Sequence, residues 1–493
     1  MASLTRMPFG AIAAFALIAV TLVASQLSMP GFLGLSITCF VITTLAPFVH
    51  SLRRGFNAGE ALYPFVVYYA VAMGVRGIAL LVPEDSPYLA AIQDPRSATF
   101  QGLMGWMFFL SAIGLAALLL GYESAAGVWA GERLGRWLGR KVWRPARTST
   151  VAAAFLAVGF VGATLHARSF GGFRAAATQD LVFVATEGSL GNFWKLVLME
   201  FAVVGFHVLL LGELMRGGRK MRWGRVVPVG ALVTSLYLVT SSKFLLLRIL
   251  LPPMLFFHLL RRRISLAHLA VFFAVFGALF PIFYAHRLLG FGDWGAILSQ
   301  VRDVPHDSWF DAIPLLGRAY DADSFVRVLH DTGRTAPFRF GGSFLDIFTF
   351  FIPRALWPAK PPSYGLEFAD QYFGDVNLGG LSFVSPSLPG ELYLNFHVAG
   401  ILAGMFAFGV LLRAAWRAAM TGGAPGALLY GYFYLFAIHL VEGSIASQVE
   451  MLLMSVAPAW LALRALGAGG PRRAGVRELT AAAMAGRARG PAG

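Results

Sequence analysis

The sequence predicts an all-α polytopic membrane protein with about twelve transmembrane helices. Hydrophobic residues make up 57% of the 493-residue chain and charged residues only 13%, whereas a soluble globular chain is about half apolar and about a quarter charged. Apolar runs of the roughly 20 residues that a spanning helix needs recur along the chain. Lipid is therefore the expected solvent for most of this protein.

Each expected spanning helix is one of these apolar runs. The expected helices are 8–28, 31–50, 60–82, 102–121, 149–166, 193–215, 226–242, 244–260, 265–285, 397–413, 425–443 and 450–467. The first run has signal-like charge, but it is about twenty residues long and another run follows at once, so we expect a spanning helix there.

The positive charges predict the orientation. The net charge is +15, yet the cations separate the apolar runs instead of forming one face, which argues against nucleic-acid binding. With the N-terminus inside, the predicted inside segments contain 25 of the 40 Lys and Arg residues. An even number of spans then places both termini in the cytoplasm.

Four regions are expected along the chain. Transmembrane helices one to nine occupy 1–285, an external loop domain occupies 286–396, helices ten to twelve occupy 397–467, and a disordered basic tail occupies 468–493. The loop domain has 12 acids against 8 Lys and Arg and many aromatic residues, which favours an ordered, functional segment. Within it, "GGSFLDIFTFFIP" predicts a short helix in the membrane interface.

Several ionisable residues fall in the outer half of the predicted spans. Such residues are costly in a membrane and therefore suggest function. They are Arg76, Lys243, Arg248, His439, Glu442 and Glu450. One interpretation is snorkelling cations and helix caps; the other is a polar cavity for an anionic group such as a lipid diphosphate, which Arg binds bidentately.

The stretch "FIPRALWPAKPP" carries two cations between prolines. Proline restricts the backbone on both sides of Arg354 and Lys360. A rigid turn could hold phosphate at low entropic cost, or it could simply position the loop. Further along, Glu391 and His397 flank "LYLN" at the entrance to the expected helix 397–413 as an acid/base pair, although Glu391 could equally cap that helix near its positive end.

Other chemistries lack a signature. The sequence has no HExxH motif, no cysteine pair beside the single Cys39, no His cluster at ligand spacing, no GxxxxGK[ST] loop and no GxSxG elbow. Neither a metal nor a cofactor is expected. Asp321 and Asp323 alternate in "AYDADSF", which is more typical of helix capping than of a metal site.

The region from Arg318 to Gly409 resembles the bacterial oligosaccharide repeat-unit polymerases of the Wzy type, which make O-antigen and exopolysaccharide. The similar pieces are "GRAYDADSFVRVLHDT", "FRFGGSFLDIFTFFIPRALWPAKPP" and "SPSLPGELYLNFHVAGILAGMFAFG". "TSSKFLLLRILLPPMLFFHLLRRRIS" resembles the hinge of that family. The chain departs from the family pattern at His397, where Gly is usual, and at Lys243, where Arg is commoner.

The resemblance implies a glycosyltransferase of the C-superfamily architecture in the bacterial inner membrane. It would polymerise undecaprenyl-diphosphate-linked oligosaccharides at the periplasmic face without a metal. The implied residues are Glu391 as acid/base, Arg354 beside it in the catalytic set, and for diphosphate or substrate Arg76, Lys243, Arg248, Arg318, Lys360, Asn395, His397 and Glu442. The resemblance also implies membrane lipid and a chain-length regulator as partners.

Three alternatives remain open. An O-antigen ligase would use the same donor, but its His-bearing loop motif is not evident. A flippase for lipid-linked oligosaccharide tends to have short loops and internal repeats, and no repeat is evident here. A non-catalytic scaffold of envelope assembly would tolerate substitution of Arg354 or Arg248.

Overall fold

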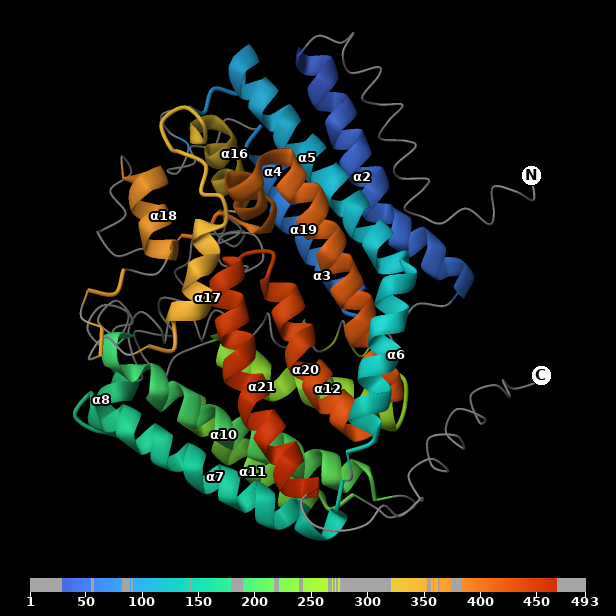
Figure 1. Ribbon diagram of the computed structural model, residues 1–493, viewed down its shortest axis with the longest axis vertical. Helices are drawn as coiled ribbons and strands as arrows, with labels where there is room; N and C mark the ends of the chain where they lie inside the picture. Colours follow the sequence, from blue (N-terminus) through green and yellow to red (C-terminus); the bar gives the residue numbers. More distant parts are fainter. Residues whose placement is uncertain are drawn as a thin grey trace.

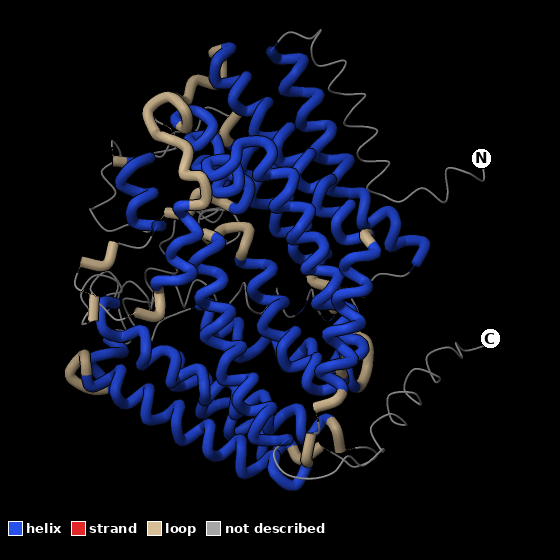
Figure 2. The backbone as a smooth tube through the Cα atoms, viewed as in Figure 1, coloured by secondary structure: helices blue, strands red, loops and turns tan. Residues whose placement is uncertain are grey.

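The computed structural model describes residues 29–54, 57–81, 89, 92–141, 143–178, 189–216, 221–238, 243–264, 268, 271, 274, 321–352, 356–357, 359–361, 364–374 and 384–467. Over these ranges the protein is built from helices, turns and loops (Figure 2). The predicted helix 8–28 and nearly all of 265–285 lie outside the described residues, as do the loop segment 286–320 and the tail 468–493.

Within the described residues, seven helices are long and apolar enough to cross a membrane. The prediction of a multi-pass helical membrane protein is thereby confirmed, while twelve spans and a C-superfamily architecture stay predictions. The seven spans lie within α2 (Met29–Arg54), α3 to α4 (Leu62–Tyr69, then the π-helix η2 at Ala70–Val75, then Arg76–Ala79), α5 (Ala98–Glu123), α7 (Pro145–Arg168), α10 (Ser189–Leu214), α19 (Leu388–Thr421) and α21 (Ile445–Gly467).

The helices pack in two groups that α20 (Gly423–His439) and α21 join (Figure 1). In the first group α2, α5 and α19 lie side by side, with α3 and η2 against them. In the second, α7 packs along α10, and the shorter α11 (Trp223–Leu238) and α12 (Lys243–Leu260) lie against α10. Each group has its own buried apolar core.

Glycine allows the close approach of α5 and α19. A Cβ on Gly409 would come within 1.9 Å of the backbone oxygen of Leu118, and one on Gly121 within 2.0 Å of that of Phe406. Small residues let membrane helices approach until their backbones touch, where van der Waals packing replaces the hydrophobic driving force that lipid removes.

A helix occupies part of a predicted inside loop. α6 (Ala125–Gly139) lies in the basic segment between α5 and α7, for which no helix was predicted. It packs along the C-terminal end of α19. Its packing face consists of Gly127, Gly131 and Gly135, spaced four residues apart, instead of an apolar stripe. A glycine stripe carries no hydrophobic periodicity, so the helix could not be predicted from it.

α19 contains a sharp break that divides the "GELYLNF" segment from the spanning part. Phe396 and His397 have non-helical backbone angles, with φ +58° and ψ −153° at His397. The side chain of Leu392 lies against Gly404, and the backbone oxygen of Leu392 lies against Gly400. The first turns, 388–395, therefore fold back along the spanning part, which follows the break at 396–397.

The described part of the external segment consists of short helices over one end of the bundle. They are α16 (Asp321–Asp331), the 3-10 turn η5 (Gly342–Leu345), α17 (Asp346–Thr349) and α18 (Tyr364–Phe373). η5 and α17 replace the expected interfacial helix with two single turns. They contact α21, and α16 contacts α4, α5 and α19 (Figure 1).

Candidate functional site

Arg76 anchors α16 to the membrane bundle. Its Nε and Nη2 donate to the two carboxylate oxygens of Asp323 at 2.8 and 2.9 Å. Asp323 is fully buried, so this bidentate pair compensates for removing its charge from water. Arg76, predicted to hold diphosphate, is thus engaged with a carboxylate of the external segment.

Two further acids lie beside this pair. The Tyr68 hydroxyl donates to Glu442 Oε2 at 2.5 Å. The carboxyl group of Asp321 is buried, and its Oδ2 has no hydrogen-bond partner. Burial, together with the charges of Glu442 and Asp323, raises the pKa of Asp321 well above its usual range. Asp321 therefore binds a proton more tightly than an exposed aspartate does.

Glu391 joins three segments of the chain. Its side chain is 0% exposed, Oε1 accepts from the Ser343 hydroxyl at 2.7 Å, and Oε2 accepts from the backbone N–H of Ile445 at 2.6 Å. Ile445 is the first residue of α21, so Glu391 caps a different helix from its own. Asn395 completes the junction by donating to Ser343 Oγ at 2.8 Å and accepting from the Gly341 N–H at 2.8 Å.

These contacts are those of a residue that holds the scaffold together. Both carboxylate oxygens of Glu391 are occupied and none of its surface reaches solvent. Its predicted acid/base role stays a prediction. The alternative, a cap on the helix that it enters, is wrong, because Ser387 caps α19 by accepting from the Gly390 N–H and Glu391 instead accepts from the first N–H of α21.

Lys360 lies within a second polar cluster at the proline-rich turn. Its ammonium donates to the backbone oxygens of Phe350 and Ile352 at 3.1 and 3.2 Å, which ties the two sides of the turn together. Its charge also acts on Asp346 of α17 and on Glu450 of α21. Lys360 and Glu450 are both partly exposed, so this cluster can be approached from outside.

Asp346 fixes the next element of the loop. Its Oδ2 accepts from the Tyr364 N–H, the first of α18, at 2.6 Å. Burial raises the pKa of Asp346, and that hydrogen bond and the Lys360 charge oppose the shift. The carboxyl group therefore positions α18 relative to the turn.

Arg248 does not belong to this cluster. Its Nη1 donates to Glu200 Oε1 at 2.5 Å, and Ser455 donates to Glu200 Oε2 at 3.1 Å. Arg248 and Glu200 are 6% and 1% exposed, and the pair lies between α10, α12 and α21. The predicted diphosphate ligand is thus part of a buried ion pair inside the second helix group.

Two positions near the end of α20 differ from the expectation. His439 is the last residue of α20 and Glu442 lies in the turn beyond it, so the two do not share a helix face. Glu450 lies in the second turn of α21, which begins at Ile445, so it does not open that helix.

His397 lies at the reversal of the chain within α19. At φ +58° and ψ −153° it occupies a region that only glycine adopts without strain. The ring is exposed and lies against Tyr393 and Phe338, with centroid distances of 4.7 and 5.7 Å. A Gly at this position would suit the reversal of the chain better.

The structure thus brings together part of the predicted site. Glu391 and Asn395 share one junction. The Leu388 N–H donates to Val441 O, and this bond links the junction to the turn that bears Glu442. Arg318 and Arg354 lie outside the described residues, as does the side chain of Lys243.

Tyr68, Ser343 and Asp346 were missed because each needs its partner to be recognised. Asp321 and Asp323 were expected to cap a helix. Both lie in the first turn of α16, where Asp323 pairs with Arg76. No group of three His, Cys, Asp or Glu residues suited to a metal occurs among the described residues.

Together these observations define an all-helical, multi-pass membrane protein with a polar site under a cap of short helices. Comparisons of the chain with protein-family models, with curated proteins and with solved structures give no match.

Proposed function

We propose that this protein is a membrane glycosyltransferase that polymerises oligosaccharide repeat units carried on undecaprenyl diphosphate. The observation that carries the proposal is that Lys360 binds the backbone oxygen of Phe350 at the end of α17, which packs against α21, the helix that bears Glu450. A cation and a carboxylate, both partly exposed, are brought to the capped end of the bundle by a proline-rich turn and by a membrane helix. The resemblance of the 318–409 region to repeat-unit polymerases supplies the substrate class.

The chemistry follows from the groups present. The hydroxyl oxygen of the acceptor sugar attacks the anomeric carbon of the donor, whose bond to the diphosphate oxygen breaks. The hydroxyl proton passes to a carboxylate, for which Glu450 is more accessible than Glu391. The electron pair leaves with the lipid diphosphate, whose growing charge is stabilised by Lys360 and, in this proposal, by Arg354 and Arg318.

Membrane anchoring suits such a substrate. The lipid keeps the diphosphate at the interface, so an enzyme that works on it needs its cations at the end of an apolar bundle instead of in its middle. Lys360 meets that condition, whereas Arg248 does not, because it is buried against Glu200. In this proposal Glu391, Ser343 and Asn395 position the cap, and the capped end faces the periplasm.

The proposal is tested by glycan length in a bacterial host whose own polymerase gene is deleted and whose repeat unit the protein accepts. If the chain restores a ladder of lengths, it polymerises. In a host that lacks its flippase instead, single repeats that reach the surface only when the chain is present identify a flippase. In a host that lacks its ligase instead, polymer that is joined to lipid A core only when the chain is present identifies a ligase.

A further inference from the structure

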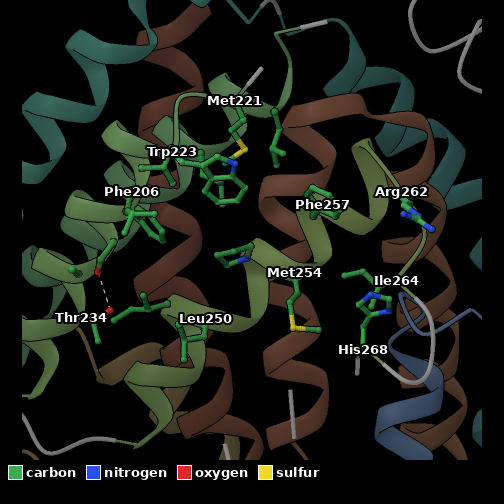
Figure 3. Close-up of a pocket in the computed structure, with 18 of the residues that line it drawn as sticks. Phe206, Met221, Trp223, Thr234, Leu250, Met254, Phe257, Arg262, Ile264 and His268 are labelled. Carbon is green, nitrogen blue, oxygen red and sulfur yellow. Dashed lines mark hydrogen bonds between the residues drawn. The ribbon is translucent and has the colours of Figure 1, made fainter. Parts of the chain in front are cut away.

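A pocket of about 730 Å³ lies between α10, α11 and α12, far from the capped end. This volume falls in the range of roughly 300–1,000 Å³ that small-molecule sites occupy. Figure 3 shows its lining, which is mainly apolar: Phe206 from α10, Trp223 at the start of α11, and Leu250, Met254 and Phe257 from α12.

One end of the pocket is basic. Arg262, Arg263 and His268, which follow α12, line it there and are exposed. Trp223 lies at the same end and is 56% exposed. Trp marks membrane–water interfaces and Arg the headgroup region beyond, so this end lies at the membrane surface. Both loops that meet there belong to the predicted cytoplasmic side.

The rest of the pocket extends toward the membrane interior. Trp223 and Thr234, which both line it, are about 16 Å apart along α11 at 1.5 Å per residue. Its rim residues Val227, Leu250 and Phe257 are 58%, 38% and 38% exposed, so the rim presents apolar surface where lipid is the solvent. A ligand there needs a long apolar part and an anionic end.

We propose that this pocket binds one anionic diacyl phospholipid of the leaflet on the basic side. An acyl chain lies along α11 and α12, and the phosphate contacts Arg262 and Arg263. Arginine pairs with phosphate bidentately, and basic pockets between membrane helices suit anionic headgroups. A zwitterionic lipid has the same phosphate, but its ammonium group meets like charge. This inference is independent of the proposed glycosyl transfer.

The test measures lipid retention by native mass spectrometry of the full chain, purified in detergent and given equal amounts of phosphatidylglycerol and phosphatidylcholine with the same acyl chains. Arg262→Gln/Arg263→Gln removes the charges, and Ala231→Trp fills the pocket from an exposed lining position. The control is Arg225→Gln, an exposed arginine on α11 that does not line the pocket.

The intact chain and the control should retain phosphatidylglycerol in preference to phosphatidylcholine. The double variant should lose about twenty-five-fold in retention of phosphatidylglycerol, since each arginine near an anionic headgroup contributes about fivefold. Ala231→Trp should lose both lipids. Equal retention of the two lipids by the intact chain, or undiminished phosphatidylglycerol in the double variant, overturns the proposal. Because both arginines are exposed, the double variant should fold, and it tests the proposal even if Ala231→Trp fails to fold.

Discussion

Glu391 and Ile445 are joined by a hydrogen bond of 2.6 Å between a carboxylate oxygen and the first backbone N–H of α21. The bond ties the folded-back start of α19 to a helix that begins 54 residues later. The same carboxylate accepts from Ser343, so a single side chain fixes the external turn η5 on both helices.

Glu391 should therefore affect stability more than chemistry. Gln can keep the Ile445 bond with its oxygen and donate to Ser343 Oγ, so Glu391→Gln should cost less than about 1 kcal/mol. Glu391→Ala removes the acceptor of both the Ile445 N–H and the Ser343 hydroxyl hydrogen and should cost about 2–4 kcal/mol. Thermal unfolding in detergent measures both. A Gln variant that unfolds like the intact chain yet makes no polymer would instead identify a catalytic carboxylate.

His397→Gly should be more stable than His397→Ala. Within a helix Gly usually costs about 1 kcal/mol relative to Ala, but the positive φ of His397 reverses that order, because Ala retains strain of about 1–3 kcal/mol. Both variants lose the ring contacts with Tyr393 and Phe338, so the difference between their stabilities reports only the backbone strain at position 397. Equal melting temperatures would show that the reversal at 397 is not strained.

The Arg248–Glu200 pair should behave as a buried ion pair. Arg248→Met or Glu200→Met alone should cost about 3–5 kcal/mol, because each leaves one charge buried without its partner, while the double variant should recover most of that loss. The melting temperatures of the intact chain, the two single variants and the double variant give a double-mutant cycle for this pair. If Arg248→Met melts normally but stops polymerisation, Arg248 binds substrate as the sequence suggested.

Asp321 should make stability depend on pH. Its folded pKa lies above the ordinary 3.8, so the folded protein binds a proton that the unfolded chain releases, and stability falls as pH rises above about 4. The groups around it are Glu442, Asp323 with its partner Arg76, and Tyr68. Asp321→Asn cannot ionise, so its melting temperature should exceed that of the intact chain at pH 8 and approach it at pH 4.5. A difference that is the same at both pH values would contradict a raised pKa of Asp321.

The membrane class and most helix positions could be predicted from the sequence because each spanning helix carries its own signal, an apolar run of sufficient length. α6 could not, since Gly127, Gly131 and Gly135 pack by their small size and leave no hydrophobic pattern. The break in α19 was hidden because "GELYLNFHVAG" continues into an apolar run.

The site was harder to predict because charge alone does not reveal pairing. Arg76 and Arg248 were rightly identified as costly residues in a membrane. Their partners Asp323 and Glu200 are separated from them by 247 and 48 positions, so the sequence could not show that each cation is paired. Only tertiary contact distinguishes such a pair from a cation available to substrate.

The central claim is that Lys360 and Glu450 serve glycan polymerisation. Its most direct test is glycan length in a polymerase-deficient host carrying Lys360→Met, Glu450→Gln or the control Arg96→Ala, an exposed arginine in the α4–α5 connection, at matched protein levels. Loss of the ladder to single repeats in the first two and a full ladder in the control is the predicted result. Full ladders in all three would contradict the account.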